Sequence, residues 1–141
     1  MTRIAALGLD VGRKRIGVAG CDGLGLFATG LTTIWRREQG ADLAAIAELV
    51  RERQVEVLVL GLPYQMDGSL GTQARQVQKF ARILERHLGL PVEFVDERLT
   101  SFQSEELIKA EGGSPSRDKG LIDRKAAALI LQQWLDERRA P

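Results

Sequence analysis

The fold is decided by the stretch Ile4-Ala-Ala-Leu-Gly-Leu-Asp-Val11, which is followed by Gly12-Arg-Lys14 and then by Arg15-Ile-Gly-Val-Ala19. The first segment is almost continuously apolar, which is typical of a central strand that is covered on both faces. The second segment predicts a turn, and the third predicts a strand antiparallel to the first. A glycine-rich turn at residues 20–25 leads to a third predicted strand over residues 26–34. The chain therefore opens with a three-stranded meander.

Beyond residue 40 the apolar residues recur with helical spacing. These stripes predict a helix through residues 43–50 and another through residues 77–88, which ends at Gly89. Short apolar segments at residues 55–60 and 92–95 predict two buried strands between and after these helices.

The last third of the chain predicts two more helices. Thr100 with Gln103 fits a capping box that opens a short helix to about Ala110. A polar loop at residues 111–119 separates it from a final helix over about residues 120–138. Strands that are separated by helices pair in parallel through right-handed crossovers. We therefore predict an α/β fold, in which a three-stranded antiparallel meander plus two parallel strands form a five-stranded mixed sheet with helices on both faces.

Length and composition predict one domain over residues 1–141, because a domain usually takes roughly 100–200 residues. Apolar residues make up 44% of the chain and charged residues 28%, as in an ordinary soluble globular protein. No apolar run reaches the roughly 18–20 residues of a membrane span, so no membrane partner is expected. The single cysteine, Cys21, cannot form an internal disulfide, which favours the reducing cytoplasm.

The net charge of +1 conceals an uneven distribution along the chain. Residues 1–40 carry six basic and three acidic groups, residues 41–112 carry eight and twelve, and residues 113–141 carry six and four. The balance lacks the basic excess that most nucleic-acid-binding proteins show. It still allows such binding if the cations gather on one face of the protein.

Asp10 is the residue that fits least well with a purely structural role. It interrupts an apolar strand, where burial of an isolated carboxylate costs several kcal/mol unless something compensates it. Gly12, two residues later, leaves room for a backbone or a ligand to approach closely. The alternative is that the strand ends near Leu9 and that Asp10 caps the turn.

Asp96 and Glu97 directly follow the fifth predicted strand, whose carboxyl end is expected at the functional edge of an open sheet. Side-chain alternation sends the two acids to opposite faces, so only one is expected to join Asp10, and the spacing leaves open which one. The alternative is that this acidic strand end pairs with Arg98.

Asp123 lies on the final predicted helix, in one stripe with Ala126, Ala127, Ile130 and Trp134. That stripe is the inward face of the helix, so the carboxylate is expected to point toward the sheet. The alternative is that Asp123 only interacts with the positive end of the helix dipole.

The three acidic positions are best explained together. Carboxylates that converge at low dielectric repel one another, and hard oxygen ligands suit Mg²⁺ or Mn²⁺. Two such ions about 3.5–4 Å apart activate a water molecule and stabilise the leaving oxygen of a phosphodiester. The residues therefore predict metal-dependent phosphodiester hydrolysis, with two Mg²⁺ or Mn²⁺ ions as cofactors.

Four segments of the chain carry a family resemblance. They are Leu9-Asp-Val-Gly-Arg-Lys-Arg-Ile-Gly-Val-Ala19, Val59-Leu-Gly-Leu-Pro-Tyr-Gln-Met-Asp-Gly68, Asp96-Glu-Arg-Leu-Thr-Ser101 and Lys119-Gly-Leu-Ile-Asp-Arg-Lys-Ala-Ala127. Together they resemble the YqgF/RuvX family of bacterial nucleases, in the same order and over nearly the whole chain. The resemblance implies a ribonuclease H-like fold, which agrees with the order of strands and helices predicted above.

The resemblance also implies a function and a site. It makes Asp10, Glu97 and Asp123 the catalytic, metal-binding acids, with Asp96 as the substitute for Glu97. It implies a hydrolase that acts on structured RNA or branched DNA and leaves a 5′-phosphate and a 3′-hydroxyl. The family is associated with 5′-end processing of pre-16S rRNA, which would make ribosome precursors a partner, and with Holliday-junction resolution. A resolvase cuts two strands symmetrically, which predicts a homodimer.

Ten basic residues are candidates for binding the phosphates of the substrate. They lie beside the predicted acids, on the second predicted helix and around the polar loop: Arg13, Lys14, Arg15, Arg75, Lys79, Arg82, Arg98, Arg117, Lys119 and Arg124. For the residues of the second helix, the alternative is a solvated surface. Phosphate contacts carry little sequence information, so cleavage is expected to select structure rather than sequence.

Two other functions stay open at this stage. A non-catalytic nucleic-acid-binding or ribosome-assembly module would keep the acids for stability alone. An ATP-binding protein of the actin and sugar-kinase type would use residues 10–17 as a phosphate loop, although 141 residues supply only one of its two lobes. Trp35 and Trp134 are expected to be packing residues.

Overall fold

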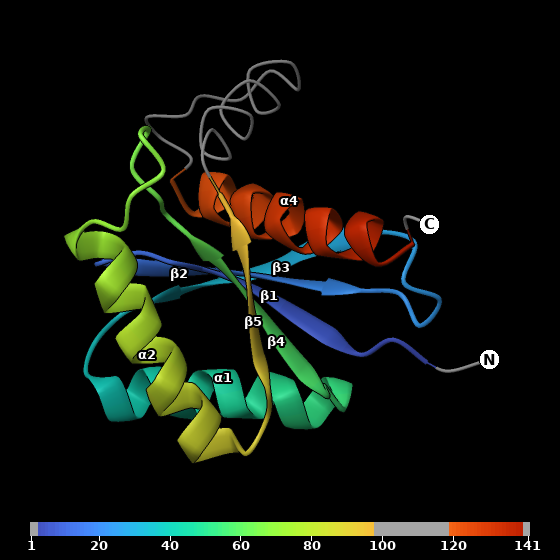
Figure 1. Ribbon diagram of the computed structural model, residues 1–141. Coiled ribbons are helices and arrows are strands. Elements are labelled where there is room, and N and C mark those ends of the chain that lie inside the picture. The colour runs from blue at the N-terminus through green and yellow to red at the C-terminus, as the bar shows by residue number, and fades with distance from the viewer. Residues whose placement is uncertain (1–2, 98–118, 140–141) are drawn as a thin grey trace.

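The computed structural model describes residues 3–97 and 119–139, which form five strands and three helices (Figure 1). In chain order they are β1 (Ala6–Val11), β2 (Arg15–Cys21), β3 (Ala28–Trp35), α1 (Gln39–Arg53), β4 (Val57–Leu62), α2 (Thr72–Leu88), β5 (Val92–Asp96) and α4 (Lys119–Arg139). The predicted short helix and residues 111–118 of the predicted polar loop lie outside the described residues, and Lys119 belongs to α4.

The five strands form one sheet in the order β3-β2-β1-β4-β5. The pairs β1–β2 and β2–β3 are antiparallel, whereas β1–β4 and β4–β5 are parallel. This arrangement confirms the predicted mixed sheet. Asp10 and Val11 pair with Gly17 and Ile16, so β1 continues past Asp10. The alternative in which the strand ends near Leu9 and Asp10 caps a turn is therefore wrong, because the β1–β2 ladder extends one residue beyond the carboxylate.

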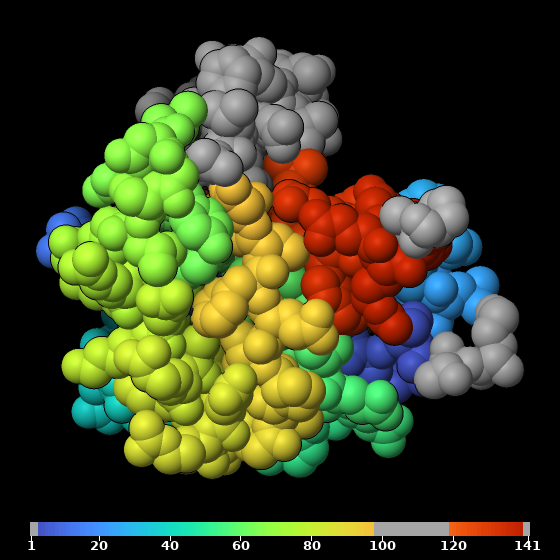
Figure 2. Space-filling view, in the orientation of Figure 1, coloured from blue at the N-terminus to red at the C-terminus, as the bar shows by residue number. Residues whose placement is uncertain are grey.

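Helices cover both faces of the sheet. The larger core lies against α1 and α2, where Leu9, Ile16 and Leu60 of the sheet meet Ile46 and Leu84 of the helices. The smaller core lies against α4 on the other face and contains the buried residues Ala6, Ala19, Val59, Val95, Ala127, Ile130, Leu131, Trp134 and Leu135. The predicted inward stripe of the last helix is thereby confirmed. Figure 2 shows β5 on the outside of the molecule between α2 and α4.

Small residues let α4 pack directly on the backbone of the sheet. A Cβ added to Gly8 would lie 2.8 Å from the Cβ of Leu131, and one added to Gly17 would lie 1.9 Å from the carbonyl oxygen of Asp123. A larger side chain at either position would force the helix away from the sheet. The close contact at Gly17 fixes the start of α4 above the β1–β2 pair.

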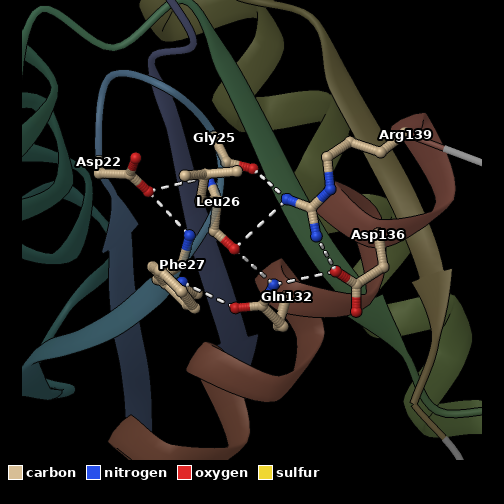
Figure 3. A network of polar contacts seen from close by, with 8 residues as sticks. Asp22, Gly25, Leu26, Phe27, Gln132, Asp136 and Arg139 are labelled. Carbon is tan, nitrogen blue, oxygen red and sulfur yellow. Dashed lines mark hydrogen bonds and ion pairs between the residues drawn. The ribbon is translucent and has the colours of Figure 1, made fainter.

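The other end of α4 is tied to the turn between β2 and β3 (Figure 3). The Asp22 carboxylate accepts hydrogen bonds from the backbone N–H groups of Leu26 and Phe27 at 2.9 and 2.8 Å. Gln132 of α4 donates to the carbonyl oxygen of Leu26 at 3.0 Å, and Arg139 donates to that of Gly25 at 2.6 Å. Both ends of α4 are therefore held in register with the sheet.

The two tryptophans differ in exposure. Trp134 is buried, with 6% exposed, and its Nε1–H donates to Glu93 at 3.0 Å. Trp35 is 61% exposed, so the prediction that it is a packing residue is wrong. It is the last residue of β3, which lies at an edge of the sheet. Within the described ranges, no helix has the length and apolarity that crossing a membrane would require.

Candidate active site

Asp10 and Asp123 are brought together by the register of β1 with β2. Asp10 pairs with Gly17, and the backbone of Asp123 lies directly over Gly17. Because Leu9 and Val11 face the larger core, alternation places Asp10 on the opposite face, which α4 covers. Both carboxylates therefore belong to the α4 side of the sheet.

Glu97 reaches the same side from β5. Val95 belongs to the α4 core, and Glu93 bonds Trp134 of α4, so alternation places Glu97 on this face and Asp96 on the other. The backbone N–H of Glu97 donates to the carbonyl oxygen of Leu62 at 3.3 Å, which extends the β4–β5 pairing.

Gly61 on β4 makes the space that the Glu97 carboxylate occupies. A Cβ added to Gly61 would lie 2.7 Å from Oε2 of Glu97 and 2.5 Å from Cδ1 of Ile130. The geometry thus places Glu97, rather than Asp96, over the sheet beside Asp10. The sequence alone left this choice open.

The carboxyl groups of Asp10 and Glu97 interact directly. Burial raises the pKa of Glu97 to about 9, and the negative charge of Asp10 and their mutual hydrogen bond add to the rise. Burial also raises the pKa of Asp10 to about 6; the hydrogen bond with Glu97 and the charge of Arg15 oppose this rise, whereas the charge of Asp123 favours it. Two desolvated carboxyl groups therefore share one small space and resist ionising together.

The carboxylate of Asp123 pairs with Arg15 and does not join the carboxyl groups of Asp10 and Glu97. It accepts a hydrogen bond from Nε of Arg15, and the two side chains form an ion pair that is 14% and 25% exposed. Among the described residues, no three His, Cys, Asp or Glu side chains lie close enough together to hold one metal ion. The structure thus brings Asp10 and Glu97 into contact and places Asp123 near them, turned toward Arg15.

The donor set nevertheless fits a divalent cation. Asp10 and Glu97 offer hard carboxylate oxygens, which are the ligands that Mg²⁺ and Mn²⁺ prefer. Desolvation is the main cause of both raised pKa values, and a cation between the two groups would favour their ionised forms, since a divalent ion reverses the local electrostatics. Asp123 is close enough for its charge to affect Asp10, and it would supply a third carboxylate on releasing Arg15.

The predicted phosphate-binding residues are dispersed around this pair. Arg13 and Lys14 are exposed in the β1–β2 turn, and Lys119 is exposed at the start of α4. Arg15 is engaged with Asp123, and Arg124 donates to Oγ1 of Thr33 at 3.3 Å.

On α2, the side chains of Arg75, Lys79 and Arg82 are all exposed, but only Lys79 lines a groove next to the β1–β2 turn. Arg98 and Arg117 lie outside the described residues. The structure therefore does not gather the other eight predicted cations, which it describes, into one cluster.

Three residues that line this groove were not predicted to have a functional role. They are Trp35, Arg36 and Arg37, at the end of β3 and in its connection to α1. Arg36 and Arg37 lie between two regular elements, where no periodic pattern indicates a role. The only sequence signal for a role of these residues was the run of one aromatic and two basic residues at positions 35–37.

Sequence comparison finds close relatives over the whole chain. A family model described as "RuvX: Holliday junction resolvase" matches residues 4–137. A protein of Synechococcus elongatus, named "Putative pre-16S rRNA nuclease", is 70% identical over 141 residues, which is all of this chain and 95% of the relative. One of Trichormus variabilis with the same name is 70% identical over 136 residues, 96% of this chain and 90% of the relative.

Solved structures share the fold at low sequence identity. The Fowlpox virus resolvase in complex with Holliday junction DNA has a TM-score of 0.61 at 11% identity, covering 97% of this chain and all of the other. RuvC of Thermus thermophilus in complex with a Holliday junction substrate has a TM-score of 0.58 at 16% identity, covering 96% and 95%. The five-stranded mixed sheet with helices on both faces is therefore the ribonuclease H-like fold of these resolvases.

Proposed function

Because this chain belongs to the RuvX family of Holliday junction resolvases, which are nucleases, we propose that it hydrolyses phosphodiester bonds in structured nucleic acid through divalent ions. Asp10, Glu97 and Asp123 would hold the ions. The observation that carries this assignment is the direct contact of Asp10 and Glu97, two carboxyl groups whose pKa values are both raised. Ionising both desolvated groups destabilises the fold, and binding a cation would offset that cost.

The proposed roles follow from the positions of the side chains. Asp10 and Glu97 would bind the ions on the α4 side of the sheet, and Asp123 would join them once it releases Arg15. When bound, Mg²⁺ or Mn²⁺ would activate a water molecule and stabilise the charge on the scissile phosphate. Arg15, freed from Asp123, would then lie beside the phosphate that it neutralises.

The substrate class is inferred from the relatives. Proteins 70% identical to this chain are named for pre-16S rRNA, and the family and its structural neighbours are named for Holliday junctions. We therefore assign to this chain 5′-end processing of pre-16S rRNA, resolution of Holliday junctions, or both. The first substrate would make ribosome precursors a partner, and the second would require a homodimer, because two strands must be cut symmetrically.

Three further assignments belong to this proposal. The cofactor is a pair of Mg²⁺ or Mn²⁺ ions, as two-ion phosphodiester cleavage requires. Residues 1–141 act as one nuclease domain, since all the described strands join one sheet. The protein works in the cytoplasm, where the lone Cys21 stays reduced.

A cleavage panel tests the proposal. Purified protein is incubated with four-way DNA junctions and with precursor rRNA that carries an extended 5′ end, in Mg²⁺, in Mn²⁺ or in EDTA. We expect metal-dependent cleavage of at least one substrate, and its loss in the Asp10→Asn variant. Inactivity of the wild-type protein on both substrates in both metals would contradict the proposal and favour a non-catalytic binding module. Family membership already favours the nuclease over an ATP-binding lobe.

A further inference from the structure

A groove of about 670 Å³ lies at the β1–β2 turn, on the face of the sheet that α1 and α2 cover, whereas the acids lie on the α4 face. Val11 and Gly12, which directly follow Asp10, form one wall. The other walls come from the end of β3 with its connection to α1, and from the first half of α2. The groove thus begins at the residues that follow Asp10 in the chain, on the other face of the sheet.

The floor of the groove is electrically neutral. Asp42 is 3% exposed and is the single acidic residue among the described residues that line it. It forms an ion pair with Arg36 at 3.1 Å. The guanidinium of Arg36 also donates to the carbonyl oxygen of Gly12 at 2.8 Å and lies 4.9 Å from the centre of the Phe80 ring. Arg36 is therefore a structural residue that ties the turn to α1 and α2.

The rim of the groove is positive. Four exposed basic residues line it in addition to Arg36, namely Arg13, Lys14, Arg37 and Lys79. Within residues 3–97 and 119–139, no acidic side chain forms an ion pair with any of the four. In a chain whose net charge is only +1, these cations are gathered on one surface. A surface of this kind attracts phosphates.

Trp35 joins this groove to the active site. The guanidinium carbon of Arg15 lies 5.5 Å from the centre of the indole ring, and Arg15 bonds Asp123. Arg15 covers part of the indole, yet Trp35 remains 61% exposed. An indole that stays in water forgoes the large gain that burial of an aromatic ring brings, so its exposure points to a ligand with a flat face.

These features together fit one class of partner. Cations that track a backbone and an exposed aromatic ring are the combination that binds unpaired nucleic-acid strands. In a duplex the bases stack on one another and have no free face to offer an indole. A ligand that carried phosphates alone would have no use for the indole.

We propose that this groove binds an unpaired strand of nucleic acid that continues from the phosphodiester held by the acids, with one base stacked on Trp35 and its phosphates bound by the four exposed cations. The inference rests on the proposed function, because it takes the strand at the acids as given. Trp35 and the four exposed cations would then favour binding of substrates that have unpaired nucleotides next to the cleaved bond.

Binding is tested without cleavage, in the Asp10→Asn protein with EDTA. The probes are 12-nucleotide single strands of RNA and DNA, and a duplex of the same sequence. We expect the single strands to bind more tightly than the duplex and to quench tryptophan fluorescence, since the only other tryptophan, Trp134, is buried. Adding Trp35→Ala should weaken single-strand binding about tenfold, and Trp35→Phe should keep it within about threefold, because phenylalanine retains an aromatic face.

The cations are tested in the same assay. Lys79→Glu and Arg37→Glu should each weaken binding and make the slope of log affinity against log salt shallower by about 1. Arg51→Glu is the matched control, because Arg51 is an exposed arginine in the last turn of α1 and does not line the groove. It should leave both affinity and slope unchanged.

The outcomes separate this inference from the proposed function. Unchanged single-strand binding in Trp35→Ala, or equal effects of Lys79→Glu and Arg51→Glu, would overturn the groove assignment even if the wild-type protein cleaves its substrates. Binding that depends on Trp35 and Lys79 in a protein that cleaves nothing would support the groove and refute the nuclease.

Discussion

The acidic side chains at the two ends of α4 have opposite electrostatic properties. Asp22, beside the end of α4, is exposed, and hydrogen bonds from the backbone N–H groups of Phe27, Leu26 and Leu24 lower its pKa (Figure 3). Asp10 and Glu97, beside the start of α4, are partly buried and hydrogen-bonded to each other, and desolvation raises both pKa values. Asp22 stabilises a turn when it is charged, whereas Asp10 and Glu97 destabilise the fold when both are charged.

This contrast indicates where the molecule carries its function. The Asp22 carboxylate is stabilised in its charged form by three backbone donors and needs no ligand to offset its charge. Two desolvated carboxyl groups in contact make the ionised fold less stable, which a structural role does not require. The candidate active site therefore differs from the other end of α4 in that ionising its acids lowers the stability of the fold.

The largest expected effect is on catalysis. Asp10→Asn and Glu97→Gln should each lower the cleavage rate by more than the roughly 10–100-fold loss that follows when a group only orients a metal ligand. Asp22→Asn changes an acid in the same way at the other end of α4 and should retain wild-type activity. Initial rates on the substrate that the wild-type protein cleaves check this. Equal losses in Asp22→Asn and Asp10→Asn would contradict the assignment.

The next effect is on stability in EDTA as a function of pH. A raised pKa means that the folded protein binds protons more tightly than the unfolded chain, so these two groups lose stability as pH rises. The loss runs from about 4 to 6 for Asp10 and from about 4.5 to 9 for Glu97. Asp10→Asn removes one of the charges, and should therefore raise the melting temperature relative to wild type at pH 8.

The control for this comparison is the same pair of proteins at pH 4. There Asp10 is largely protonated in the folded state, and the advantage of Asp10→Asn should disappear. Thermal unfolding followed by circular dichroism at both pH values measures it. A variant that is less stable than wild type at pH 8 in EDTA would show that Asp10 stabilises the metal-free fold.

A smaller effect with the opposite sign is expected at the other end of α4. Asp22→Ala should lower the melting temperature at pH 7 by about 5 °C, because three backbone N–H groups lose their acceptor. The stabilisation by Asp22 exists above its unfolded pKa and is lost as pH falls through its lowered pKa. The difference in melting temperature between Asp22→Ala and wild type should therefore shrink in acid, because the wild type loses stability there. The difference for Asp10→Asn also shrinks in acid, but because the wild type gains stability when Asp10 is protonated. A difference that grows in acid would contradict the assigned role.

The smallest effect concerns Arg15. Its guanidinium occupies the carboxylate of Asp123 and competes with a cation for it. Arg15→Gln should therefore tighten Mn²⁺ binding severalfold, as measured by calorimetry without substrate. Arg13→Gln removes a neighbouring charge that makes no ion pair among the described residues, and should change Mn²⁺ affinity less. Weaker binding in Arg15→Gln would show that Arg15 supports the site instead of competing for it.

Much of the fold could be predicted because its signals are local. Short apolar segments identify the strands, apolar stripes of period 3.6 identify the helices, and the inward stripe that contains Asp123 is readable from spacing alone. The choice between Asp96 and Glu97 could not be read in this way. It depends on which face of β5 meets α4, and that is fixed by pairing with β4, far away in the sequence.

Two features of the site are tertiary in origin and escaped the sequence. Trp35 is exposed because β3 lies at an edge of the sheet, and no local pattern distinguishes an edge strand from a central one. The pairing of Asp123 with Arg15 joins residues 108 positions apart through the close packing of α4 on Gly17. The sequence predicted that three acids would meet, and it carried no signal that one of them would hold an arginine.

The central claim is that Asp10, Glu97 and Asp123 together hold divalent cations, and calorimetric titration of metal-free protein with Mn²⁺ tests it most directly. We expect saturable binding of two ions to the wild-type protein, an equal titration for Asp22→Asn, and loss of at least one ion in each of Asp10→Asn, Glu97→Gln and Asp123→Asn. Titrations of these three variants that match the wild type would contradict it.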